Sequence, residues 1–110
     1  MLRHIVMWKF RPGTEAERDL FLTGLQGLYG AIPELKRCQV LLGMEGSDYD
    51  AVLISEFADQ AALEAYKNDP RHKAVSALCK SIRTDRAAVD CLRPDPEEEG
   101  KNAGGRFQGR

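Results

Sequence analysis

Three side chains of this sequence could move protons near neutral pH. One is His4, close to the start of the chain, and the others are Tyr66 and His72, which are six residues apart. An imidazole titrates near physiological pH, and a tyrosine hydroxyl can orient or polarise a substrate oxygen. The three residues are therefore candidates for general acid–base chemistry, provided that the fold brings them together.

Each candidate also has a structural interpretation. A histidine on an apolar strand face is more often a hydrogen-bonded core residue than a catalyst. The ring of Tyr66 can pack in the core while its hydroxyl binds a backbone carbonyl. His72 falls in the first turn of a predicted helix, where the helix dipole favours a neutral imidazole. That neutral form suits a general base and a structural histidine equally.

Composition excludes several classes of function. The 110 residues include 16 basic and 17 acidic side chains, a net charge of −1, which argues against a nucleic-acid binder and a polybasic membrane anchor. No apolar run approaches the ~20 residues of a spanning helix, and the N-terminus lacks the features of a signal peptide. The cysteines Cys38, Cys79 and Cys91 have no metal-ligand spacing and predict reduced, inert thiols in a cytoplasmic protein. We expect no metal or other cofactor.

Four segments have the pattern of strands. In residues 2–10 one face carries His4, Val6 and Trp8, and the other face also carries apolar residues, so this strand belongs in a sheet covered on both sides. A turn with two glycines separates the second strand from the third and predicts an antiparallel hairpin. Strands are expected over residues 2–10, 36–44, 49–57 and 84–92.

The segments between these strands predict helices. Thr14 and Glu17 have the spacing of a capping box, and the helix that follows should end near Gly30. Asp59 is a suitable N-cap for a second helix, which is interrupted and restarted at Asp69. The order of elements is then β-α-β-β-α-β. It predicts an α+β, ferredoxin-like fold with a four-stranded antiparallel sheet and both helices on one face.

That fold leaves the second face of the sheet uncovered, although the strands carry apolar residues there. An apolar face of this size indicates a protein–protein interface, and a second copy related by a two-fold axis is the simplest cover. We therefore expect a homodimer through the sheet faces, a dimeric α/β barrel. The domain is predicted to span residues 1–92. Residues 93–110, rich in charge, glycine and proline, predict a flexible tail, with docking on the domain as the alternative.

Motifs along most of the chain resemble those of one family. They are R-H-I-V-x-W-K-F from Arg3, I-P-E-L from Ile32, D-Y-D-A-V-L-I-S-E-F from Asp48, A-L-E-A-Y-K-N-D-P-R-H-K-A-V from Ala62, and R-A-A-V-D from Arg86. In these motifs the chain resembles the stress-responsive A/B barrel (Dabb) domain proteins. The resemblance implies a ferredoxin-like fold that dimerises into an α+β barrel in the cytosol.

The resemblance also implies a site. In a plant polyketide cyclase of the family, the catalytic tyrosine and histidine are similar to Tyr66 and His72, and a histidine of the first strand is similar to His4. The pocket of that cyclase lies between the sheet and the helices. Carried over to this chain, the residues that bind substrate would include Val6, Trp8, Phe21, Leu25 and Arg83.

Two hypotheses about function remain open. In the first, the protein is a homodimer without an assigned reaction that binds a small apolar molecule between sheet and helices. A departure from the family's H-P-x-H motif supports this hypothesis, because this chain has Asp69 in place of the first histidine. In the second, the protein is a cofactor-free enzyme with cyclase-like aldol or proton-transfer chemistry. His72 would abstract a proton, Tyr66 would hold the enolate oxygen, and His4 would assist. The space around His72 discriminates between them, because ligand pockets measure ~300–1,000 Å³.

Overall fold

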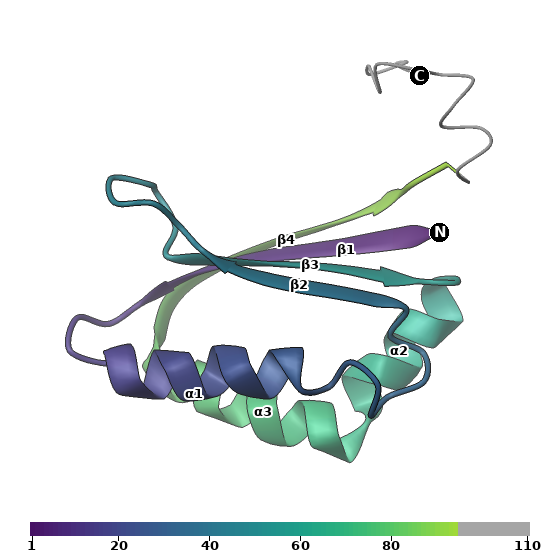
Figure 1. Ribbon diagram of the computed structural model, residues 1–110, viewed down its shortest axis with the longest axis horizontal. Helices are drawn as coiled ribbons and strands as arrows, with labels where there is room; N and C mark the ends of the chain where they lie inside the picture. The colour runs from purple at the N-terminus through teal and green to yellow at the C-terminus, as the bar shows by residue number, and fades with distance from the viewer. Residues whose placement is uncertain (95–110) are drawn as a thin grey trace.

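The computed structural model describes residues 1–94, which form one sheet with helices on one side (Figure 1). The strands are β1 (Leu2–Phe10), β2 (Arg37–Leu42), β3 (Ala51–Phe57) and β4 (Arg83–Leu92). The helices are α1 (Glu15–Gln26), α2 (Gln60–Asn68) and α3 (Pro70–Ile82). The predicted order of elements is confirmed, with the second helical segment divided into α2 and α3.

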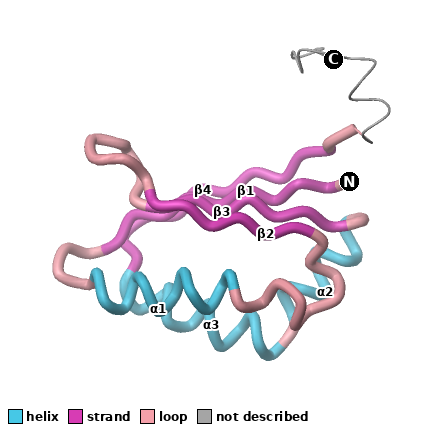
Figure 2. The backbone as a smooth tube through the Cα atoms, viewed as in Figure 1, coloured by secondary structure: helices cyan, strands magenta, loops and turns pink. Residues whose placement is uncertain are grey.

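The sheet is antiparallel throughout, in the order β2-β3-β1-β4. All three helices lie against the same face of it (Figure 2). This arrangement confirms the ferredoxin-like α+β fold. The other face has no helix over it, so its residues are shielded only by their neighbours within the described part of the chain.

The core lies between the sheet and the helices and follows the alternation of β1. Every even residue of that strand is buried, and every odd residue is partly exposed on the outer face. Trp8 packs its ring against the edge of Phe21 from α1, with 5.0 Å between the ring centroids. Burial of such aromatic rings is a large apolar contribution to stability.

Two details of α1 differ from the sequence prediction. The capping box at Thr14 is wrong, because the Thr14 hydroxyl donates to the carbonyl of Arg11 at 2.6 Å and makes no cap bond to the helix. That bond closes the turn through Gly13, whose φ of +85° only glycine adopts easily. The helix also ends at Gln26 rather than near Gly30, which lies in the turns that follow.

The other predicted caps are confirmed. Asp59 accepts a hydrogen bond from the backbone of Ala62 at 2.9 Å and starts α2. Asp69 ends α2 and caps α3, accepting from the backbone N–H of Arg71 at 2.8 Å. With Pro70 at the start of α3, this junction fixes where the helix begins and therefore places His72 in its first turn.

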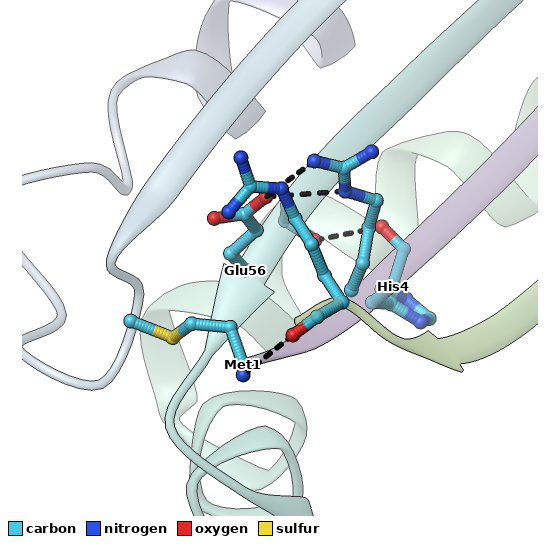
Figure 3. Close-up of polar contacts among 6 residues, drawn as sticks. Met1, His4 and Glu56 are labelled. Carbon is cyan, nitrogen blue, oxygen red and sulfur yellow. Dashed lines mark hydrogen bonds and ion pairs between the residues drawn. The ribbon is translucent and has the colours of Figure 1, made fainter. Parts of the chain in front are cut away.

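A polar cluster closes one end of the sheet (Figure 3). Glu56 is buried and accepts two hydrogen bonds from Arg3, at 3.1 and 2.8 Å. The backbone of Arg93 pairs with that of Met1, and its side chain lies 3.6 Å from Glu56. Arg93, the first residue of the predicted tail, is therefore attached to the folded unit. The remainder of that prediction, from residue 95, lies outside the described residues.

Candidate functional site

His72 lies in the first turn of α3, directly after the cap at Asp69. Its side chain is half-buried between the helix and the sheet, and its Nδ1 is a buried atom without a hydrogen-bond partner among residues 1–94. A buried polar atom left unpaired costs ~1–3 kcal/mol, so such atoms are rare and are often found at functional sites. The local sequence thus places an unsatisfied imidazole nitrogen beside the sheet.

His4 is near the start of β1, on the helix side of the sheet, and is 5% exposed. Its direct partner in the sheet register is Asp90 on β4, and the Asp90 carboxylate lies 2.5 Å from His4 Nδ1. A carboxylate accepts hydrogen bonds, so Nδ1 carries the proton and Nε2 is the free acceptor of a neutral ring. The Ser55 hydroxyl donates to the His4 carbonyl and fixes the backbone there.

Tyr66 is fully buried near the end of α2, between two other rings. Its ring centroid lies 5.0 Å from that of Phe57 and 4.5 Å from that of His72. Its hydroxyl is the other buried side-chain atom in the described chain that has no hydrogen-bond partner. Burial raises the pKa of Tyr66, so the hydroxyl keeps its proton at neutral pH.

Both histidines are held in the neutral form. Burial lowers the pKa of His72 most strongly. Hydrogen bonding with the Lys67 backbone raises this pKa, while the positive charges of the Lys67 and Arg86 side chains lower it further. Burial also lowers the pKa of His4 and outweighs the hydrogen bond and charge of Asp90, which raise it. A neutral imidazole is the form that can accept a proton.

Two spaces meet at these histidines. The larger is a groove of about 490 Å³ between α3 and the sheet, and the smaller is an inner cavity of about 50 Å³ beneath it. His4, His72, Ser76 and Arg86 line both. The groove alone has the size of a ligand site, whereas the inner cavity has roughly the volume of one or two waters.

The predicted substrate-binding residues all meet at the inner cavity. Its lining includes the five that the resemblance implied, namely Val6, Trp8, Phe21, Leu25 and Arg83. Tyr66 lines neither space and reaches the site only through its contact with His72. The fold thus brings the two histidines and the pocket residues together, with the tyrosine behind them.

The sequence profile of the stress responsive A/B barrel domain, Dabb, matches residues 2–92. The chain belongs to the Dabb family. The match spans every strand and helix of the structure and includes both histidines of the site. A comparison with curated protein sequences gave no match.

Several solved structures resemble this Dabb domain. A dimeric protein of unknown function with a ferredoxin-like fold from Bacteroides fragilis is 25% identical, with a TM-score of 0.76 over 82% of this chain and 93% of its own. A dimeric ferredoxin-like protein of unknown function from Thermobifida fusca is 26% identical, with a TM-score of 0.75 over 84% and 90%. The hydroxynitrile lyase from Passiflora edulis, at 13% identity and a TM-score of 0.75 over 86% and 94%, shares the fold.

The residues that surround the histidines of this Dabb domain do not stand out in the sequence. Asp90 follows from the strand register, which pairs it with His4, and the alternation of β4 places Arg86 on the same face. Ser76 and Lys80 lie four and eight residues after His72, so helical spacing alone puts them on its face of α3. The alternation in β4 and the helical spacing in α3 can be seen in the sequence. Only the strand register and the packing of α3 on the sheet show that these residues line one groove.

Three further features of residues 1–94 concern metal ligands, membrane-spanning helices and reactive thiols. That part of the Dabb domain contains no group of three or more His, Cys, Asp or Glu side chains placed to hold a metal ion. None of its helices is long and apolar enough to cross a membrane. Burial raises the pKa of Cys38 to about 11 and also raises that of Cys79, so neither thiol is activated.

Proposed function

We propose that this Dabb domain forms a homodimer through the outer face of its sheet. That face carries apolar residues on all four strands and has no helix over it. Its central apolar residues, which we call the outer patch, are Ile5, Met7, Val52, Ile54 and Val89. A continuous apolar face of this kind is typical of a protein–protein interface, and two similar solved structures are described as dimeric.

We infer that the groove is the site of cofactor-independent proton transfer on a small carbonyl compound. The observation that carries this proposal is the neutral His72, whose ring lines a groove of about 490 Å³ and whose buried Nδ1 has no hydrogen-bond partner among residues 1–94. A base placed within hydrogen-bond reach of a C–H next to a carbonyl can remove its proton and give an enolate. One such group accelerates a reaction roughly 10²–10⁴-fold.

The neighbouring residues have distinct parts in this proposal. His4 is the second proton carrier, and Asp90 fixes its tautomer through Nδ1. Arg86 lines both spaces and is suited to stabilise the enolate oxygen, because its guanidinium is always charged. Tyr66 is a positioning residue that supports the His72 ring, since its hydroxyl lines neither space.

A second candidate function is binding without reaction. It is favoured by the inner cavity, which measures only about 50 Å³ and leaves little room for a reacting substrate beneath the histidines. In that case the groove would hold a ligand, and the histidines would serve only as hydrogen-bonding groups. The two candidates differ in whether a bound carbonyl compound exchanges its protons.

The test is deuterium exchange of the C–H protons next to the ketone of 2-hexanone and of levulinate, followed by NMR in D₂O. We expect the wild-type protein to accelerate exchange of at least one compound over buffer, and His72→Gln to lose at least ~10-fold of that acceleration. Lys36→Gln, an exposed lysine outside both spaces, is the matched control and should exchange like wild type. The proposal fails if neither ketone exchanges faster than in buffer, or if a folded His72→Gln keeps the full rate.

A further inference from the structure

The groove beside His72 is strongly cationic. Among residues 1–94, its lining includes no acidic side chain and four positive ones, namely Lys67, Lys73, Lys80 and Arg86. The chain as a whole carries a net charge of only −1, so this concentration is local and does not follow from the composition. Like charges held at one concave surface repel one another and attract an anion from solution.

No ion pair within the described part of the chain neutralises these cations. Within residues 1–94, none of the four takes part in an ion pair, although Arg3, Arg18 and Arg71 all do. The carboxylate of Asp90 is already bonded to His4, and that of Asp69 is bonded to Arg71. The groove therefore keeps an excess of positive charge, and both histidines experience it in the neutral form.

A second, independent feature points to a ligand in the same place. The buried Nδ1 of His72 has no hydrogen-bond partner in the described residues, yet the ring lines both the groove and the inner cavity. Below the cations, one part of the wall of the inner cavity is apolar and includes Val6 and Leu25, while polar side chains form the rest. A ligand that matched both parts would have a charged end in the groove and a short apolar end directed at the cavity.

We propose that the groove binds a short-chain organic anion, a carboxylate or phosphate whose charged group lies among Arg86, Lys73 and Lys80. This inference deepens the proposed function by naming the substrate class, and it rests on that function for the role of His72. Arg86 is the central recognition residue, because a guanidinium binds carboxylate and phosphate oxygens in a bidentate manner. The lysines add charge that draws the anion to the groove.

The experiment measures binding of hexanoate, hexanamide and hexyl phosphate to the full chain by NMR titration of backbone amides. The three probes carry linear alkyl chains of five or six carbons and differ in the charge and geometry of the head group. We expect hexanoate or hexyl phosphate to shift the amide signals of α3 and β4. At least one of these anions should bind at least ~10-fold more tightly than hexanamide, with an affinity that falls as salt is added. The tighter of the two anions identifies the head group.

Variants decide which residues are responsible. Arg86→Gln should weaken binding of the anion at least ~10-fold and leave binding of hexanamide unchanged, while Lys36→Gln should bind both like wild type. The inference is overturned if hexanamide binds as tightly as the anions, if no anion binds, or if the shifts lie away from α3 and β4. Failure of the proposed function is separate: His72→Gln would then bind the anion normally while ketone exchange stays at the buffer rate in both proteins.

Discussion

His4 and Asp90 are direct partners across β1 and β4, with Nδ1 and the carboxylate oxygen 2.5 Å apart. His4 is buried, and the side chain of Asp90 is 37% exposed, so the bond joins a buried imidazole to a carboxylate that reaches solvent. Because the carboxylate accepts from Nδ1, it fixes the tautomer that leaves Nε2 unprotonated. A strand register formed by backbone bonds thus determines the protonation pattern of a side chain in the site.

Asp90→Asn should remove the preference of His4 for that one tautomer. The amide can present either a donor or an acceptor to the ring, and the charge that raises the pKa of His4 is lost, so this pKa should fall further. We expect a second tautomer in ¹⁵N spectra of the imidazole and a loss of about 1–2 kcal/mol in the free energy of unfolding. Asp48→Asn, in an exposed turn, is the control and should change neither quantity. An unchanged tautomer in Asp90→Asn would show that the bond does not orient the ring.

Acidification should destabilise the fold before its carboxylates titrate. The pKa values of His4 and His72 are lowered in the folded state from an ordinary value of 6.5, so below that value the unfolded chain binds more protons. The stability that these neutral histidines provide is complete above about pH 7.5 and declines as the pH falls through 6.5 towards the lowered values.

Urea unfolding between about pH 7.5 and pH 5 measures this decline, at one protein concentration throughout. His72→Gln should flatten the curve in that window, because glutamine does not titrate. Glu56 and Asp69 act at lower pH, since Arg3 and Arg71 lower their pKa values, that of Asp69 to about 2. A wild-type stability that is constant down to pH 5 would contradict the prediction.

Removal of the Tyr66 hydroxyl should not harm the fold. It is buried without a partner, so Tyr66→Phe should leave the free energy of unfolding unchanged or raise it by up to ~1 kcal/mol. Tyr66→Ala, which also removes the ring packed on Phe57 and His72, should cost about 3–5 kcal/mol. Chemical denaturation measures both.

The same pair of variants separates two roles for Tyr66. As a positioning residue, it should allow ketone exchange in Tyr66→Phe to stay within about threefold of wild type. If the hydroxyl instead holds the enolate oxygen, as the family resemblance implies, exchange should fall at least ~100-fold while the fold stays intact. A loss of this size would show that the Tyr66 hydroxyl contacts the reacting atoms directly.

Local patterns in the sequence were enough for most of the fold. The alternation in residues 2–10 predicted which side of β1 is buried, and Asp59 and Asp69 predicted where α2 and α3 begin. These features depend on neighbours within a few residues. The failure at Thr14 has the same origin, because a hydroxyl can bond back to the preceding turn as easily as forward to the helix.

Local sequence patterns predict only part of the site. The histidines attract notice by residue type, but the cations around them are ordinary surface residues in the sequence. Arg86 and His72 are brought together by the register of β4 on β1 and by the packing of α3, contacts that span the chain. Long-range pairing of this kind cannot be read from spacing, which is why the electrostatic character of the groove emerged only in three dimensions.

The outer patch should be essential for self-association. Ile54 lies at its centre, paired with Ile5 on β1 and with Gln39 on β2. Ile54→Lys would put a charge into an apolar interface, where an unpaired charge costs several kcal/mol, so we expect a monomer at micromolar concentration. Sedimentation velocity measures the mass, and the wild-type protein should be a dimer.

Leu20→Lys is the matched control for this prediction. Leu20 is 66% exposed on α1, on the other side of the molecule from the outer patch, so the same change of side chain there should leave the dimer intact. Circular dichroism checks that both variants keep the fold, because a lysine on a partly exposed strand face can extend its amine into water once the partner is lost. A wild-type monomer, or an Ile54→Lys protein that remains a dimer, would mean that the outer patch is not where two copies meet.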